Sequence, residues 1–162
     1  MKRIKLTQGK YALVDDSDFE YLNQFNWTTS KAISRNTHYA GRGFKRSDGK
    51  WTTMRMHREI MDAPKGMEVD HIDGNGLNNQ RANLRICTRS ENARNMIKRA
   101  KAYSKYKGVS WHIRYKVWYS TITISYKRKY LGRFKTELEA AIIYNIASRK
   151  YHGEFANPNK FR

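Results

Sequence analysis

The chain has 162 residues with 33 Lys and Arg against 14 Asp and Glu, which gives a formal net charge of +19 and room for one ordinary domain or two to three small modules. No hydrophobic run approaches the length of a membrane span, and the single cysteine, Cys87, excludes an internal disulfide and a cysteine-rich zinc site. The charge predicts a polyanionic partner, and the mixing of cations with aromatic residues favours nucleic acid over a solubilising surface or an anionic membrane.

Residues 1–66 form a first segment in which short strands are expected. Residues 1–8 contain no apolar signal-peptide core, so we expect a cytosolic protein. Alternating apolar and β-branched residues predict strands at residues 10–14, 27–29, 37–40 and 51–56. Short helices are expected at residues 15–25 and 57–61, and Ser47-Asp48-Gly49-Lys50 is typical of a hairpin turn.

Residues 67–97 form a second segment with the order strand, loop, strand, helix. Strands are expected at residues 68–72 and 82–87, and the loop between them begins with a tight turn that contains two glycines. Thr88 and Glu91 have the spacing of a capping box, which predicts a helix from this point through Ile97. Cys87, just before the helix, is interpreted as a small packing residue.

Polar residues of this segment meet the needs of phosphodiester hydrolysis, which requires a base for water, a cation for the charge on phosphate, and a group that holds the base. Asp70 and Asn92 offer carboxylate and amide oxygens, the ligands that Mg²⁺ prefers. Because side chains alternate across a strand, Asp70 can hold a metal while His71 faces the attacking water. Asp-His beside a Gly-Asn loop also occurs by chance, and asparagines commonly stabilise turns.

The same segment contains Val69-Asp70-His71-Ile72-Asp73-Gly74-Asn75, then Asn78-Asn79, Asn83-Leu84-Arg85 and Thr88 through Asn92. With this spacing it resembles the HNH homing endonucleases of phages, in the branch whose last catalytic histidine is replaced by asparagine. The resemblance implies a ββα-metal fold in which His71 is the general base, Asp70 and Asn92 hold one divalent cation, and Asn83 fixes the loop and helps to orient His71. The chain lacks the flanking cysteine pairs of other HNH branches, so packing alone must hold the hairpin.

The first segment also resembles the strand-rich leader of such phage enzymes, ending in residues 56–61. His57 in this stretch is interpreted as a packing or phosphate-contact residue rather than a catalyst. After the second segment, residues 98–105 form a basic link without an acidic residue, interpreted as a solvated connector. We expect Lys98, Arg99 and Lys101 in this link to contact the phosphates of DNA.

The third segment, residues 106–162, is expected to form a sheet and a helix. Strands are predicted at residues 109–114, 117–124 and 128–134, and a second capping box, Thr136 and Glu139, predicts a helix to about Tyr151 that ends at Gly153. Along the middle strand, one face presents Trp118, Ser120, Ile122 and Ile124 and can pack under the helix. The other face presents Tyr119, Thr121 and Thr123.

This segment also contains Tyr106-Lys107-Gly108-Val109-Ser110-Trp111, Lys116-Val117-Trp118, Tyr130-Leu131-Gly132-Arg133-Phe134 and Glu139-Ala140-Ala141. With these motifs it resembles an AP2-type DNA-binding domain, which implies that the outer face of the sheet enters the major groove. The residues expected to bind DNA there are His112, Arg114, Lys116, Tyr119, Thr121, Arg128, Tyr130 and Arg133. Ser110 and His112 stand where the family usually has arginines, so the target sequence does not carry over. Trp111 fits either the core or a DNA contact.

The sequence thus predicts an α+β protein with a strand-rich DNA-contacting segment (1–66), a ββα-metal motif (67–97), a basic link (98–105) and an AP2-like domain (106–162) with a three-stranded antiparallel sheet on one helix. Its expected function is site-selective, homing-type DNA cleavage with one divalent cation, Mg²⁺ or Mn²⁺ in its place. We expect double-stranded DNA as partner, no membrane, no small-molecule cofactor, a monomer, and a location in the bacterial cytoplasm, including that of a phage host. A non-cutting DNA-binding regulator is the alternative, and an RNA-binding protein is a third interpretation.

Overall fold

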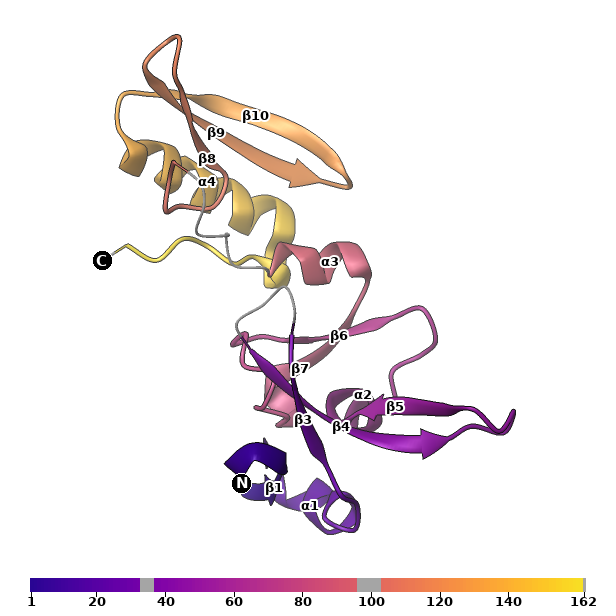
Figure 1. The fold of residues 1–162 in the computed structure, drawn as a ribbon. Coiled ribbons are helices and arrows are strands. Elements are labelled where there is room, and N and C mark those ends of the chain that lie inside the picture. The colour runs from indigo at the N-terminus through magenta and orange to yellow at the C-terminus, as the bar shows by residue number, and fades with distance from the viewer. Residues whose placement is uncertain (33–36, 96–102, 162) are drawn as a thin grey trace. The chain divides into compact units, whose positions relative to one another are not determined.

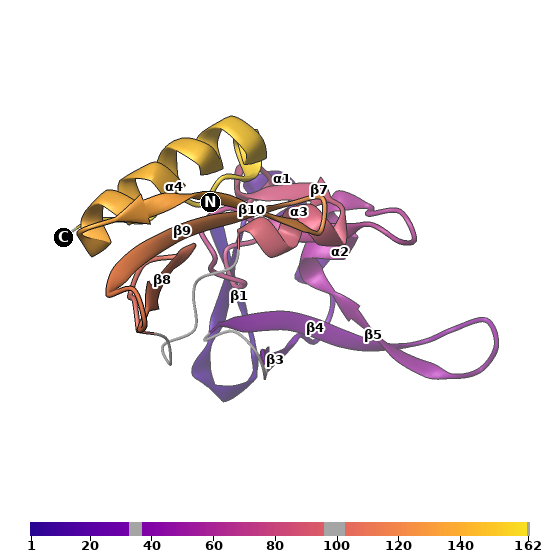
Figure 2. The same cartoon turned by 90° about the horizontal axis from the view of Figure 1, so that it is seen from above.

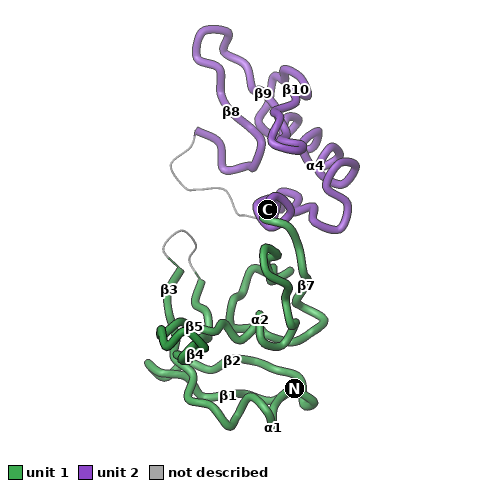
Figure 3. The backbone as a smooth tube through the Cα atoms, turned by 90° about the vertical axis from the view of Figure 1, so that its right-hand side faces the viewer, with its two compact units in different colours: residues 1–89 green, residues 90–162 purple. Residues whose placement is uncertain are grey.

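The structure is a computed structural model that describes residues 1–32, 37–95 and 103–161. The chain divides into two compact units, residues 1–89 and residues 90–162 (Figure 3). Both consist of helices and small antiparallel sheets, as expected for an α+β protein (Figure 1). No described helix is long and apolar enough to cross a membrane.

The first unit contains three small sheets. β1 (Lys2–Lys5) pairs with β2 (Tyr11–Val14), β4 (His38–Lys45) lies between β3 (Thr28–Lys31) and β5 (Trp51–Arg55), and β6 (Glu68–His71) pairs with β7 (Leu84–Cys87). Its helices are α1 (Asp16–Leu22) and α2 (Met56–Met61), with 3-10 turns at Thr7–Gly9 and Arg81–Asn83. The sequence did not predict β1, because Ile4 is its single apolar residue and the other three are charged.

One hydrophobic core joins the three sheets and both helices of this unit. Ile4 and Val14 enter it from the first sheet, Leu22 from α1, and Met56 from α2. Val69 and Leu84, 7% and 4% exposed, bring the β6–β7 hairpin into the same core. The hairpin is therefore held by packing, as the absence of cysteine pairs predicts, and its partner in packing is the N-terminal segment.

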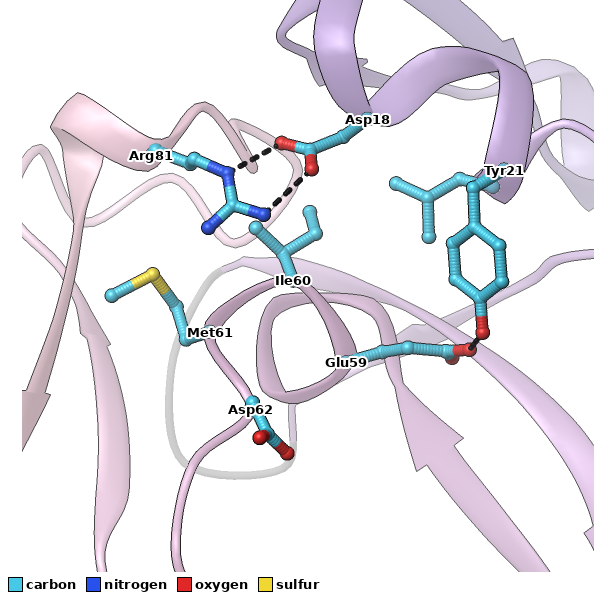
Figure 4. Close-up of a pocket in the computed structure, with 8 residues that line it drawn as sticks. Asp18, Tyr21, Glu59, Ile60, Met61, Asp62 and Arg81 are labelled. Atoms are coloured by element: carbon cyan, nitrogen blue, oxygen red, sulfur yellow. Dashed lines mark hydrogen bonds and ion pairs between the residues drawn. The ribbon is translucent and has the colours of Figure 1, made fainter.

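Ion pairs between α1 and the turn before β7 add to this packing. Asp15 precedes α1, but its side chain does not cap the helix; it accepts hydrogen bonds from Gln80 Nε2 (3.2 Å) and from the backbone N–H of Arg81 (2.8 Å). The Arg81 guanidinium donates two hydrogen bonds to Asp18, at 2.9 and 2.7 Å (Figure 4). The expected helix start at residue 15 is thus correct, but Asp15 serves the tertiary structure as well.

The second unit begins within α3 (Arg89–Arg94), whose residues from Ser90 onward belong to it. β9 (Val117–Ile124) lies between β8 (Val109–His112) and β10 (Lys127–Phe134), and α4 (Glu137–His152) runs along one face of this sheet, followed by a 3-10 turn at Gly153–Phe155 (Figures 1 and 2). β8 ends two residues before the predicted Arg114, because residues 113–116 turn the chain and Lys116 has a φ of +48°.

The start and packing of α4 follow the prediction. Glu139 N–H donates to Thr136 Oγ1 (3.2 Å) and Thr136 N–H donates to Glu139 Oε2 (3.1 Å), so the capping box is present. Ile122 and Trp118 of β9 pack against buried residues of α4 such as Tyr144 and Ala140. Gly108 makes this packing possible: it has a φ of +75°, and a Cβ there would lie 1.9 Å from the Tyr144 ring.

Candidate functional site

The β6–β7 hairpin places Asp70 and His71 on opposite faces. In its antiparallel register Asp70 is opposite Arg85, and His71 is opposite Leu84. Both polar residues are buried, with 1% and 4% of their surface exposed. Buried polar residues at adjacent positions of one strand are costly unless they are paired. Both side chains are therefore expected to have polar partners inside the folded protein.

Asp70 is paired with the partly buried guanidinium of Arg85. Arg85 donates to Asp70 Oδ2 from Nη2 (2.7 Å) and from Nε (3.1 Å), and the two side chains are 13% and 0% exposed. The guanidinium offsets the loss of hydration around the carboxylate. No role for Arg85 was expected from the sequence. The strand register would have revealed the pair, since residues 70 and 85 are opposite each other once the hairpin is closed.

His71 is held by a polar contact on one side and by rings on the other. Its Nε2 lies 3.3 Å from Oδ1 of Asn79, whose side chain is fully buried. Its ring is 5.0 Å from the His57 ring, at 80°, and 5.7 Å from the Tyr39 ring. Burial, aided by the nearby His71, Arg55 and Arg58, lowers the pKa of His57 to about 3. His57 is therefore neutral at physiological pH and packs against His71, one of the two roles expected for it.

The loop after β6 is organised around Asp73. Asn83 accepts a hydrogen bond from the Asp73 N–H (3.0 Å) and donates from Nδ2 to Asp73 Oδ1 (3.0 Å) and to the Asn78 carbonyl (2.8 Å). Asn78 Nδ2 donates to Asp73 Oδ2 at 2.8 Å. Burial acts to raise the pKa of Asp73, but the hydrogen bonds from Asn78, Asn75 and Asn83 outweigh it, and the net shift is downward. The Asn83 carbonyl also accepts from Ile72 N–H (2.9 Å), directly after His71.

Asn92, the expected second metal ligand, lies on α3 in the second unit. Two side chains of that unit hold the end of this helix: Lys107 Nζ donates to the Arg94 carbonyl, and Asn157 Nδ2 donates to the Asn95 carbonyl at 2.8 Å. Lys107 is itself fixed by Asn159, which accepts from its N–H (2.6 Å). Burial lowers the pKa of Lys107 to about 8. The helix that bears Asn92 is therefore anchored on the C-terminal sheet-and-helix unit.

The outer face of the C-terminal sheet brings together most of the expected DNA-binding residues. Opposite α4, the register pairs Tyr119 with Arg133, Thr121 with Tyr130 and Thr123 with Arg128. The His112 ring is 4.9 Å from the Tyr119 ring and 4.7 Å from the Tyr115 ring, with which it stacks, and Tyr119 is 5.6 Å from Tyr130. Tyr115 was missed because it belongs to a turn.

The remaining expected DNA contacts are divided between a turn and the basic link. Arg114 and Lys116 are exposed in the turn between β8 and β9. Lys98, Arg99 and Lys101 lie outside the described residues. Trp111 is partly buried and its ring is 4.9 Å from Trp118, which packs against the core. The outer face therefore combines cations with aromatic rings, the two kinds of group that meet phosphates and bases.

The hairpin thus brings together Asp70 and His71, both buried on one strand, with an asparagine-fixed loop and a second strand. A family model described as HNH endonuclease matches residues 62–94, which include all of this hairpin. Protein 3.8 of Escherichia phage T7 is 36% identical over 107 residues, which are 63% of this chain and 88% of the phage protein. The chain belongs to this family of phage and viral HNH endonuclease homologues.

Two further relatives have the nuclease in their names. The uncharacterized HNH endonuclease L560 of Acanthamoeba polyphaga mimivirus is 28% identical over 159 residues, or 94% of this chain and 76% of the viral protein. The SPbeta prophage-derived putative HNH homing endonuclease YosQ of Bacillus subtilis (strain 168) is 56% identical over 39 residues, or 24% of this chain and 22% of that protein. The expectation of an HNH-type nuclease is confirmed at the level of the family.

Proposed function

We propose that the chain is a site-selective, homing-type DNA endonuclease in which His71 is the general base and Asp70 and Asn92 hold one divalent cation. The observation that supports this proposal most is the burial of Asp70 and His71, each with a dedicated partner, inside the stretch that the HNH family model matches. A buried ion pair adds little net stability compared with an apolar pair of the same volume, which favours a functional role for the hairpin.

The donors suit a small, hard cation. Asp70 offers a single carboxylate and Asn92 an amide oxygen, and the described residues contain no group of three or more His, Cys, Asp or Glu that could form a closed metal site. Such a set fits Mg²⁺, which keeps several waters and binds few protein ligands, and Mn²⁺ can replace it. When bound, the cation supplies positive charge against the extra negative charge on the phosphate.

His71 and its neighbours carry out the proton transfer. Its Nε2 lies against Asn79 Oδ1, a contact that fixes the orientation of the imidazole ring. The imidazole of His71 takes a proton from water while the water oxygen bonds to phosphorus and the phosphorus bond to the leaving oxygen breaks. Asn83 holds the loop that follows His71, and the rings of His57 and Tyr39 restrict the orientation of the base.

Double-stranded DNA is the proposed substrate, read by the outer face of β8, β9 and β10. The cations and tyrosines of that face give phosphate contacts and base contacts together, and its threonines can touch thymine methyl groups. The AP2 assignment of this unit, a monomeric state and a cytoplasmic location belong to the same proposal.

Plasmid cleavage tests the function directly. Supercoiled plasmid incubated with the protein and Mg²⁺ should be nicked or linearised, and EDTA should prevent it. His71→Ala should lower cleavage about a hundredfold or more while DNA binding persists. Asp70→Ala should abolish metal-dependent cutting, and Asn92→Asp should retain it, because a carboxylate also binds hard cations. Binding without any cutting would instead identify a DNA-binding regulator.

A further inference from the structure

The β4–β5 hairpin has one face on which two positions of β4 are glycines. Its five-residue turn projects from the rest of the first unit (Figure 2). On this face the register places Gly41 opposite Arg55, Gly43 opposite Thr53, and Lys45 opposite Trp51. We call Gly43, Lys45, Trp51 and Thr53, which are all exposed, the hairpin face. Gly43 leaves a short exposed strip of backbone without a side chain beside the large aromatic ring of Trp51, whereas Gly41 is buried.

Nothing in the fold requires a glycine at residue 43. Its φ is not in the left-handed region, and a Cβ there would meet only the Trp51 ring, at 3.7 Å, an ordinary contact. Gly41 differs, because a Cβ there would approach Thr53 Cγ2 to 3.0 Å. Glycine weakens a strand interior, and where no turn or packing explains it, it marks a place where another molecule comes close to the backbone.

The side chains around Gly43 suit a polyanion that also has flat, weakly polar surfaces. Trp51 is 75% exposed at the end of the hairpin. Residues 38–55 contain five Lys and Arg and a single acidic residue, Asp48, which is paired with Arg46 at 3.2 Å. An exposed tryptophan between cations suits a nucleic acid, whose phosphates meet the lysines while a sugar or base packs on the ring.

The other end of the hairpin face lies near His71, the proposed general base. Arg55 follows Thr53 on this face and lies 5.9 Å from the Tyr39 ring, which in turn contacts His57 and His71. A ligand that lies along the hairpin face therefore extends toward the proposed base within the same compact unit.

We propose that the hairpin face is a second DNA-contact surface, on which the backbone of duplex DNA passes closely over Gly43 and a deoxyribose or base packs against Trp51. This inference rests on the proposed function only in taking DNA as the partner. The face is separate from the sheet of the second unit, and it places a contact beside the cleavage site itself.

Equilibrium binding of fluorescein-labelled duplex DNA, measured by anisotropy in EDTA, tests the surface without cleavage. Gly43→Val favours the strand but fills the strip, and it should raise the Kd about tenfold, as should Trp51→Ala. Neither change removes a cation, so the salt slope should stay the same, whereas Lys45→Met should lower it by about one unit. Thr52→Val, on the opposite face of the hairpin, is the control and should bind like the unaltered protein.

The outcomes are distinguishable. Thermal unfolding checks that each variant is folded, and Gly43→Ala, with a smaller side chain, should give a smaller loss of affinity if Gly43→Val is unstable. Unchanged Kd values for Gly43→Val or Gly43→Ala and for Trp51→Ala would overturn the proposal. So would duplex RNA or an acidic polypeptide that competes better than unlabelled DNA. Because binding is measured without metal, this result is independent of whether His71→Ala abolishes cutting.

Discussion

Replacing Arg85, whose guanidinium pairs with Asp70, is the mutation whose effect on stability follows most directly from the structure. Arg85→Met deletes the guanidinium that donates two hydrogen bonds to the carboxylate but keeps most of the volume of the side chain. Asp70 is 0% exposed at its side chain, so this variant keeps a buried carboxylate without the positive charge of Arg85. Breaking a buried pair by removing one partner costs about 3–5 kcal/mol, a large part of the stability of a small unit.

The loss of stability can be measured by urea unfolding, monitored through tryptophan fluorescence, because Trp27 lies in the core that the hairpin shares. Asp70→Asn, Arg85→Met and the double variant complete a thermodynamic cycle. The double variant should be more stable than Arg85→Met alone, since it also removes the buried negative charge that Arg85 offsets. A coupling energy below about 0.5 kcal/mol would refute the view that the pair is a structural requirement of the hairpin.

The same variant separates the structural pair from the proposed cation site. If Asp70 binds a divalent cation, Mg²⁺ offers the carboxylate a second positive charge. Adding Mg²⁺ should then stabilise Arg85→Met more than the unaltered protein, because ligand that binds the folded state shifts the unfolding equilibrium. The measurement is the urea midpoint with Mg²⁺ and with EDTA. Equal shifts in the two proteins would argue against Asp70 as a cation ligand.

Three further predictions concern the surroundings of the site. The pKa of His57 falls from 6.5 to about 3 on folding. Between these values the unfolded chain binds more protons than the folded protein, so stability is lost as the pH falls below 6.5. His57→Phe should therefore flatten the dependence of the urea midpoint on pH in this range. Lys107→Met should speed amide hydrogen exchange in α3, measured by mass spectrometry, whereas Lys105→Met, which removes the same charge from an exposed site, should leave it unchanged. Asn79→Ala should lower kcat about tenfold with little change in the Kd for DNA in EDTA, and an unchanged kcat would show that Asn79 does not orient His71.

Where the residues that define an element are close in sequence, the prediction was accurate. Strands predicted at residues 68–72 and 82–87 from local alternation are present at 68–71 and 84–87, the second shortened by the 3-10 turn at Arg81–Asn83. The capping box of α4, set by residues three apart, is present as expected. The pairing of strands at residues 117–124 and 127–134 follows in the same way from a short turn. β1 was missed because its burial depends on a partner strand and a distant core rather than on its own composition.

The sequence by itself determined the family and the candidate chemistry, because Asp70, His71, Asn83 and the start of α3 lie within one motif of fixed spacing. Only the tertiary structure decided what surrounds them. Tyr39 and His57 come from β4 and α2, and their rings contact His71 because these elements share a core with the hairpin. Such contacts depend on how separate segments pack, and side chains far apart in the chain leave no periodicity or spacing by which a sequence could reveal them.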